Sequence, residues 1–277
     1  MPTWKLTIEY DGTRYHGWQE QKNAKTVAGE IRSAAQQFFN GPVDLGGAGR
    51  TDAGVHALAQ VAHLRNRRRC DPIELLRRIN DSLPPDINLL KAEEVESRFD
   101  ARRDATTRYY LYQISTRRTA FAKKFVWWIK DILDMEAMQT AANGLIGMHD
   151  FARFADKRAE DGSTLVKVES VELVRQGDLI MFRIGASHFL WKMVRRVVGM
   201  LVEVGRGRIN PDQFAALFRE HSGQAARSGN LAQAGRNQEL TLNVAAFTAP
   251  PSGLFLERVC YHKDESPGPI RSVQMSA

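Results

Sequence analysis

The stretch Gly49-Arg50-Thr51-Asp52-Ala53-Gly54-Val55-His56-Ala57 follows a glycine-rich approach and leads into an alternating apolar run. This pattern predicts a strand, a tight turn and a second strand, with Asp52 in the turn. Two interpretations of Asp52 are open. In the first, Asp52 only makes the turn, because Asp accepts hydrogen bonds from nearby backbone N–H groups. Alternatively it is a catalytic residue, in a loop whose glycines let a bulky ligand approach the backbone closely.

Four further stretches accompany this one in a characteristic order: 8–12 with Tyr15 and Gly17-Trp18-Gln19, 108–112 (RYYLY), 189–195 (FLWKMVR) and 249–254 (APPSGL). Together they resemble the TruA-type tRNA pseudouridine synthases, also called the tRNA pseudouridine synthase I family, over nearly the whole chain. A nine-residue signature with four supporting stretches is a specific match. The resemblance therefore favours the catalytic interpretation of Asp52.

The order of predicted elements is β-α-β-β-α-β, which then repeats. The first half has strands at about 4–10, 43–48, 55–65 and 87–95, and helices at about 27–39 and 72–80. The second half has strands at about 108–115, 165–174, 179–186 and 255–261, an extended piece at 125–130, and helices at about 134–146, 192–204 and from 210. This is the ferredoxin-like arrangement in duplicate.

We therefore expect an α+β protein with two halves, residues 1–105 carrying the Asp52 loop and residues 106–277 with helical additions. Residues 221–243 are rich in Gly, Ser, Asn and Gln and predict a flexible loop. The last dozen residues are expected to fray. The resemblance implies the pseudouridine synthase fold: the two halves join in one central, mainly antiparallel sheet, with helices on one side and the other face free for RNA.

The chain is basic, with a net charge of +7 and a pI of about 9.5. Arginines and lysines gather in three segments, 65–69, 102–108 and 117–124, and aromatic residues interleave with them at 109–112 and 121–125. Cations beside aromatic rings suit a polyanion that carries stackable bases. The alternative for any one cluster is an ordinary solvated face.

The sequence gives no sign of a metal site, a disulfide framework or a membrane span. The two cysteines, Cys70 and Cys260, form no CxxC, and the histidines form no HExxH. His56 and His63 are seven residues apart on one predicted strand, which is poor metal-ligand spacing. No apolar run approaches the length of a span, and the first residues do not form a signal peptide. A cytoplasmic protein without cofactor or metal is expected.

The resemblance implies roles for three residues. Asp52 acts on the sugar carbon C1′, and Arg195 pairs with it, since an enclosed carboxylate needs a cation to offset its lost hydration. Arg196, the next residue, is expected on the helix surface. Tyr110 stacks on the target uracil and assists removal of the C5 proton, although strand alternation cannot choose between Tyr110 and its neighbouring tyrosines.

Two further residues complete the expected site. Arg50 is expected to contact the phosphate of the flipped nucleotide or to fill the position that its base leaves in the stack. Leu254 is expected to form an apolar wall of the uracil pocket. An ordinary core role is the alternative for Leu254.

The expected function is the isomerisation of uridine to pseudouridine in the anticodon stem-loop of tRNA, at tRNA positions 38–40 by family resemblance. By the same resemblance a homodimer is expected. Two alternatives remain open. One is a non-catalytic RNA-binding or RNA-chaperone protein on the same fold, and the other is a pseudouridine synthase for other RNA positions.

Overall fold

The computed structural model describes residues 1–156, 163–218, 242–262 and 264–273. The strands are β1 (Thr3–Tyr10), β2 (Asp44–Gly47), β3 (His56–Arg65), β4 (Ile87–Val95), β5 (Thr107–Ser115), β6 (Trp127–Trp128), β7 (Gly147–Asp150), β8 (Leu165–Gln176), β9 (Leu179–Ala186) and β10 (Leu254–Cys260). The α-helices are α1 (Val27–Phe39), α2 (Pro72–Asn80), α3 (Met135–Asn143), α4 (Met193–Gly205) and α5 (Pro211–Ala216). Four short 3₁₀ turns join them: η1 (Gly12–Arg14), η2 (Ala152–Phe154), η3 (Val244–Phe247) and η4 (Pro251–Gly253).

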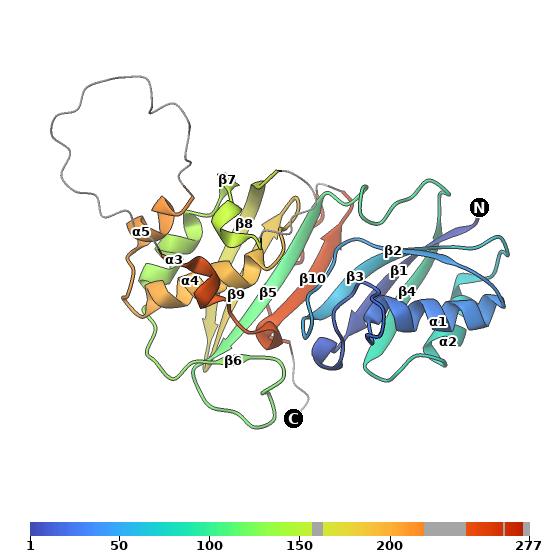
Figure 1. The fold of residues 1–277 in the computed structure, drawn as a ribbon, viewed down its shortest axis with the longest axis horizontal. Coiled ribbons are helices and arrows are strands. Elements are labelled where there is room, and N and C mark those ends of the chain that lie inside the picture. The colour runs from blue at the N-terminus through green and yellow to red at the C-terminus, as the bar shows by residue number, and fades with distance from the viewer. Residues whose placement is uncertain (157–162, 219–241, 263, 274–277) are drawn as a thin grey trace, which may run out of the picture.

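The strands form a single mixed sheet in the order β4-β1-β3-β10-β5-β9-β8-β7, with β2 paired to β3 and β6 paired to β5. Most neighbours are antiparallel, and the pairs β10–β3 and β5–β6 are parallel. Figure 1 shows this sheet running across the molecule with the helices α1 and α4 in front of it. The predicted α+β class and mainly antiparallel central sheet are confirmed.

The helices α1, α2 and α3 begin where the sequence predicts, because capping residues precede them. The Thr26 hydroxyl accepts from the Gly29 N–H at the start of α1, and Asp71 caps α2 with Pro72 at its first position. Asp134 caps α3 in the same way. Within the first half the strand order is β4-β1-β3-β2, the ferredoxin-like order, and β10-β5-β9-β8 repeats it in the second.

The two sets of strands meet where β10 lies beside β3. Phe255 pairs with His56, and Leu256 pairs with Ala57. The short β2 pairs with the far end of the same strand, from Ala62 to Arg65. The strand β3 thus pairs with β2 of its own half at one end and with β10 of the second half at the other. The division between residues 105 and 106 as a domain boundary stays a prediction.

Cross-strand register decides which residues share a face. Tyr110, Leu256, Ala57 and Tyr10 are paired in succession across β5, β10, β3 and β1, so they lie on one face of the sheet. That face packs against the helices, and it holds most of the buried core. The candidate site residue Tyr110 is therefore on the helix side of the sheet.

The C-terminal segment covers part of the opposite face. There Ile270 and Val273 pack against Leu111 and Phe255, and the Val273 N–H donates to Gln113 Oε1 at 2.8 Å. The expectation that this end frays is therefore wrong for the described residues up to 273. The expectation of a face free for RNA is wrong for the part that this segment covers. The apolar side chains of the segment find a hydrophobic face to bury against.

The loop expected at 221–243 falls almost entirely outside the described residues, as do residues 274–277. Within the described part, no helix has the length and apolar character needed to cross a membrane.

Candidate active site

The loop between β2 and β3 carries the signature. The Val55 N–H donates to the Asp52 carbonyl at 3.1 Å, which closes the tight turn that the sequence predicted. The Asp52 side chain is only 19% exposed. The residue therefore makes the turn with its backbone, and its carboxylate is left for other contacts.

Residues that follow β1 hold this loop from one side. The Trp18 N–H donates to the Thr51 carbonyl at 3.1 Å, and the Gly54 N–H donates to the Tyr15 carbonyl at 3.2 Å. Gly17 has a φ of +95°, and a Cβ there would lie 2.5 Å from the Thr51 carbonyl oxygen. Only glycine fits this close approach of two backbones.

Two buried polar side chains hold the start of the loop from beneath. Gln60 donates to the Gly49 carbonyl at 3.0 Å, and the Arg108 guanidinium donates twice to the Ala48 carbonyl, at 3.0 and 3.2 Å. Sequence reasoning placed Arg108 in a basic cluster for RNA, which is wrong, because the side chain is buried. The position of Arg108 on a predicted strand, between buried neighbours, could have indicated that its side chain is buried.

A cation from the second half of the chain reaches Asp52. Arg195, in the first turn of α4, lies with Nη1 3.3 Å from Asp52 Oδ2, and its side chain is 15% exposed. Its Nε donates to the Ala249 carbonyl at 2.7 Å, while its own carbonyl accepts from the Ala249 N–H at 3.0 Å. The guanidinium is thus oriented by the backbone before η4 and presents one edge to the carboxylate. This contact between residues 143 positions apart joins the two halves.

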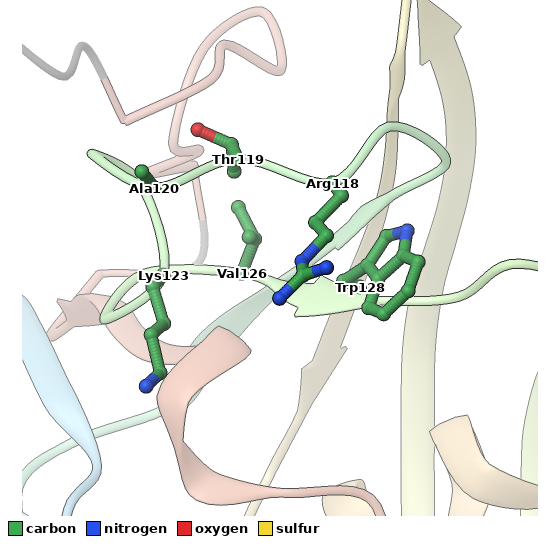
Figure 2. Close-up of a pocket in the computed structure, with 6 residues that line it drawn as sticks. All are labelled: Arg118, Thr119, Ala120, Lys123, Val126 and Trp128. Carbon is green, nitrogen blue, oxygen red and sulfur yellow. The ribbon is translucent and has the colours of Figure 1, made fainter.

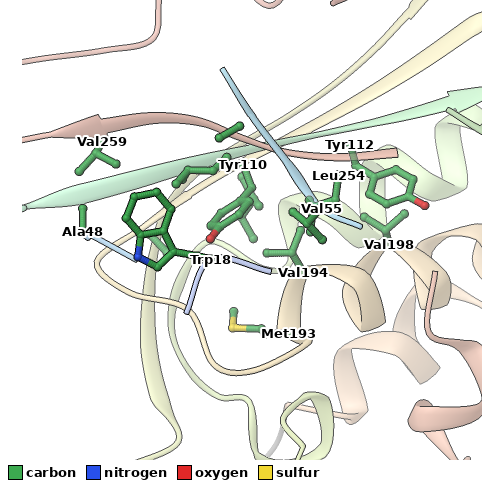
Figure 3. Close-up of a cluster of buried hydrophobic side chains, with 14 of the residues drawn as sticks. Trp18, Ala48, Val55, Tyr110, Tyr112, Met193, Val194, Val198, Leu254 and Val259 are labelled. Atoms are coloured by element: carbon green, nitrogen blue, oxygen red, sulfur yellow. The ribbon is translucent and has the colours of Figure 1, made fainter. Parts of the chain in front are cut away.

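Tyr110 lies next to this ion pair, with its ring edge-to-face against Phe189 at a centroid distance of 4.9 Å. Figure 3 shows it among Trp18, Val194 and Leu254. Burial raises the pKa of Tyr110, and the nearby Tyr10 and Asp52 raise it further. The phenol therefore stays protonated at neutral pH.

The neighbouring tyrosine on the same face has another function. The Tyr112 hydroxyl donates to the Pro250 carbonyl at 2.8 Å. This hydrogen bond stabilises the turn that precedes Leu254. Leu254 is buried at the start of β10, within the same cluster as Tyr110. Arg50, in contrast, is exposed on the Asp52 loop.

Arg196 differs from its expectation. It is buried rather than on the helix surface, and its Nη2 lies 3.9 Å from Asp156 Oδ2. Consecutive residues of α4 thus direct their guanidinium groups to two different carboxylates.

Sequence reasoning considered His56 only as a metal ligand and missed what it does. Its side chain is 1% exposed. Nδ1 accepts from the Gly12 N–H at 3.1 Å, and Nε2 lies 3.0 Å from the Lys124 carbonyl, to which it donates in this tautomer. The ring stacks on Phe255 at 4.9 Å. Among the residues that the structure describes, no three His, Cys, Asp or Glu side chains gather as metal ligands would.

Comparison with known proteins gives the family. The profile described as tRNA pseudouridine synthase matches residues 6–104 and 141–262. The chain is 40% identical over 264 residues to "tRNA pseudouridine synthase A" of Rhodopseudomonas palustris (strain BisA53), covering 94% of this chain and 100% of that protein. The chain belongs to the tRNA pseudouridine synthase family.

Two further relatives of the same name agree. The protein of Sinorhizobium fredii is 36% identical over 94% of this chain and 100% of its own length. That of Brucella ovis is 36% identical over 94% and 98%. Among solved structures, a chain of a Cbf5–Nop10–Gar1 complex aligns with 72% of this chain and 54% of its own length, at a TM-score of 0.30 and 12% identity. The resemblance read from the sequence is confirmed, and with it the isomerase class of this family.

Proposed function

We propose that this chain converts uridine to pseudouridine in the anticodon stem-loop of tRNA, at tRNA positions 38–40, with Asp52 as the catalytic residue. The observation that carries the proposal is the ion pair of Asp52 with Arg195, 3.3 Å apart beside the buried Tyr110, in the signature loop of the family.

The reaction breaks the N1–C1′ bond of uridine and joins C5 to C1′. The electron pair of the broken bond leaves with the uracil, C5 loses its proton, and N1 gains one. A carboxylate placed under C1′ can attack it or stabilise the electron-poor sugar, as the second carboxylate of a retaining glycosidase does. No water needs activation, because the departing base is recaptured. One carboxylate is therefore sufficient, and Asp52 fills that role.

Arg195 keeps the carboxylate charged and aimed. A partly enclosed anion loses hydration, and the guanidinium compensates for this loss through its charge and hydrogen bond. Because Ala249 fixes the guanidinium on its other edge, the pair is oriented before RNA arrives.

Tyr110 and Leu254 would bound the uracil from the sheet side. Stacking on an aromatic ring is worth about 1–3 kcal/mol per base, while extracting a base costs a few kcal/mol. Since the Tyr110 phenol is protonated, we assign it stacking and positioning rather than the role of an anionic base. Arg50, exposed two residues before Asp52, is placed to contact the phosphate of the extruded nucleotide or to fill its vacated position.

We further propose that the protein works as a homodimer in the cytoplasm and needs no cofactor. These points follow from the family resemblance.

Replacement of Asp52 by Asn tests the proposal. We expect no pseudouridine in a tRNA transcript by nucleoside mapping, while the Kd for tRNA stays within about threefold, because Asn keeps the size of the side chain and loses only the charge. Nucleoside mapping of tRNA treated with the native chain tests, in the same experiment, whether positions 38–40 are modified. Turnover by Asp52→Asn would refute the mechanism, and RNA binding by the native chain without any change of nucleoside would favour the chaperone alternative.

A further inference from the structure

The loop from Thr116 to Val126, between β5 and β6, encloses a hollow of about 780 Å³ (Figure 2). This volume is within the range of small-molecule sites. The lining residues are Arg118, Thr119, Ala120, Lys123, Val126 and Trp128. The proposed function does not use this hollow.

Its chemistry is cationic and aromatic. The six lining residues, all in the described stretch 118–128, include two cations and no carboxylate. Trp128 is 43% exposed, and the Arg118 guanidinium lies over its ring at 5.6 Å. Phe121, in the same loop, is 97% exposed. Cations bind phosphates and exposed ring faces stack on bases, so this combination suits an unpaired nucleotide.

The second part of the loop is fixed to the body of the protein by three side chains. His56 Nε2 donates to the Lys124 carbonyl at 3.0 Å. Gln113 Nε2 donates to the Phe125 carbonyl at 3.0 Å, and the Ser252 hydroxyl donates to the Val126 carbonyl at 3.3 Å. The hollow therefore has a fixed wall on the side where β3, β5 and η4 meet.

Two of these anchors are close to candidate site residues in the sequence. His56 is four residues after Asp52, and Ser252 is two residues before Leu254. The Phe125 ring also packs on His56, at a centroid distance of 5.1 Å. Pro251, next to Ser252 in η4, lies against Gly54 of the Asp52 loop, because a Cβ on Gly54 would meet its side chain at 3.0 Å. The hollow and the Asp52 loop therefore adjoin the same turn, η4, whereas the His56 ring lies on the face of the sheet opposite Tyr110.

We propose that this hollow binds an unpaired nucleotide of the RNA substrate other than the target uridine. Arg118 and Lys123 contact its phosphate, and the base stacks against the surface made by Trp128 and Arg118. The inference rests on the proposed function for the identity of the ligand as substrate RNA.

Binding and chemistry are measured separately to test it, with the full chain and a tRNA transcript. We expect Trp128→Ala to raise the Kd by about 5- to 150-fold, the loss of one stacked base. The single-turnover rate at saturating tRNA should match that of the native chain. Arg118→Gln should weaken binding and reduce the slope of log Kd against log salt by about 0.7–0.9, the loss of one phosphate contact. The control is Arg98→Gln, another exposed arginine, whose guanidinium pairs with Glu96. It should leave the Kd within about twofold.

A Kd within twofold of the native value for both Trp128→Ala and Arg118→Gln would overturn the proposal. So would a change of oligomeric mass with unchanged RNA affinity, because the hollow would then be an interface between copies. If Trp128→Ala does not fold, Arg118→Gln and Lys123→Gln, both of exposed residues, decide the question. The Kd is measured without any turnover. A native chain that binds tRNA but forms no pseudouridine would therefore refute the proposed function, while the comparison of Kd values between variants and native chain would still test this hollow.

Discussion

Replacing Arg195 with Met removes the cation beside Asp52 and keeps an unbranched side chain of similar length. At 3.3 Å the two charges attract by about 5 kcal/mol at an effective dielectric constant of 20. Part of this offsets the desolvation of two mostly covered ions. Removing one partner of such a pair costs about 3–5 kcal/mol when the pair is fully buried. Since 15% and 19% of these side chains remain exposed, we take the lower figure, about 3 kcal/mol, as the lost stabilisation of the charged carboxylate. Because the reaction needs that carboxylate charged, we assign the same figure to the activation barrier, which gives about a 10²-fold loss of rate.

The rate is measured in single turnovers, as release of the C5 hydrogen from tRNA labelled at uridine C5, at saturating tRNA. Arg196→Met is the matched control, because it removes the neighbouring guanidinium, which is buried against Asp156 instead. We expect it to cost stability and to leave the rate per folded molecule within a few-fold. Arg195→Lys should fall between Met and the native residue, since it restores charge but cannot also bond Ala249.

A rate for Arg195→Met within tenfold of the native value would refute the reasoning, as would equal losses for Arg195→Met and Arg196→Met. Either result would mean that the pair serves the fold and not the reaction.

Two further predictions concern the loop and its surroundings. Gly17→Ala should lower the free energy of unfolding by about 2–3 kcal/mol, because alanine is strained at a φ of +95° and its Cβ meets Thr51. The control is Gly49→Ala, whose Cβ would meet nothing within 4 Å and which should change that free energy by less than about 0.5 kcal/mol. Similar losses for the two variants in urea unfolding would contradict this account. Burial raises the pKa of Tyr110 in the folded protein. The buried neutral phenol therefore contributes fully to the free energy of unfolding below the pKa of an unfolded tyrosine, about 10, and this contribution is lost as the pH rises above that value. Tyr110→Phe should therefore show a shallower decline of unfolding free energy between about pH 9.5 and 11 than the native chain, and an identical slope would count against burial as the cause.

Much of the fold could be predicted because its signals are local. Thr26, Asp71 and Asp134 cap their helices through hydrogen bonds to residues two or three positions away, and alternation along a strand needs no distant partner. The closeness of Arg195 to Asp52 was accessible only through the family resemblance, since no spacing along the chain indicates a contact across 143 positions.

Several features were decided by tertiary structure alone. Arg108 and Arg196 look like surface cations in the sequence, yet both are buried, because their carbonyl or carboxylate partners come from distant segments. Periodicity could not show that the Tyr112 hydroxyl is taken by Pro250, or that the C-terminal segment finds an apolar face under Ile270.

The sequence by itself determined the order of helices and strands, the turn at Asp52 and the family. Only the tertiary structure decided which face of the sheet the site occupies and which cation meets the carboxylate. The physical reason is the range of the interactions. Caps, turns and alternation act between neighbours in the chain, whereas burial and ion pairing depend on which segments the sheet brings side by side.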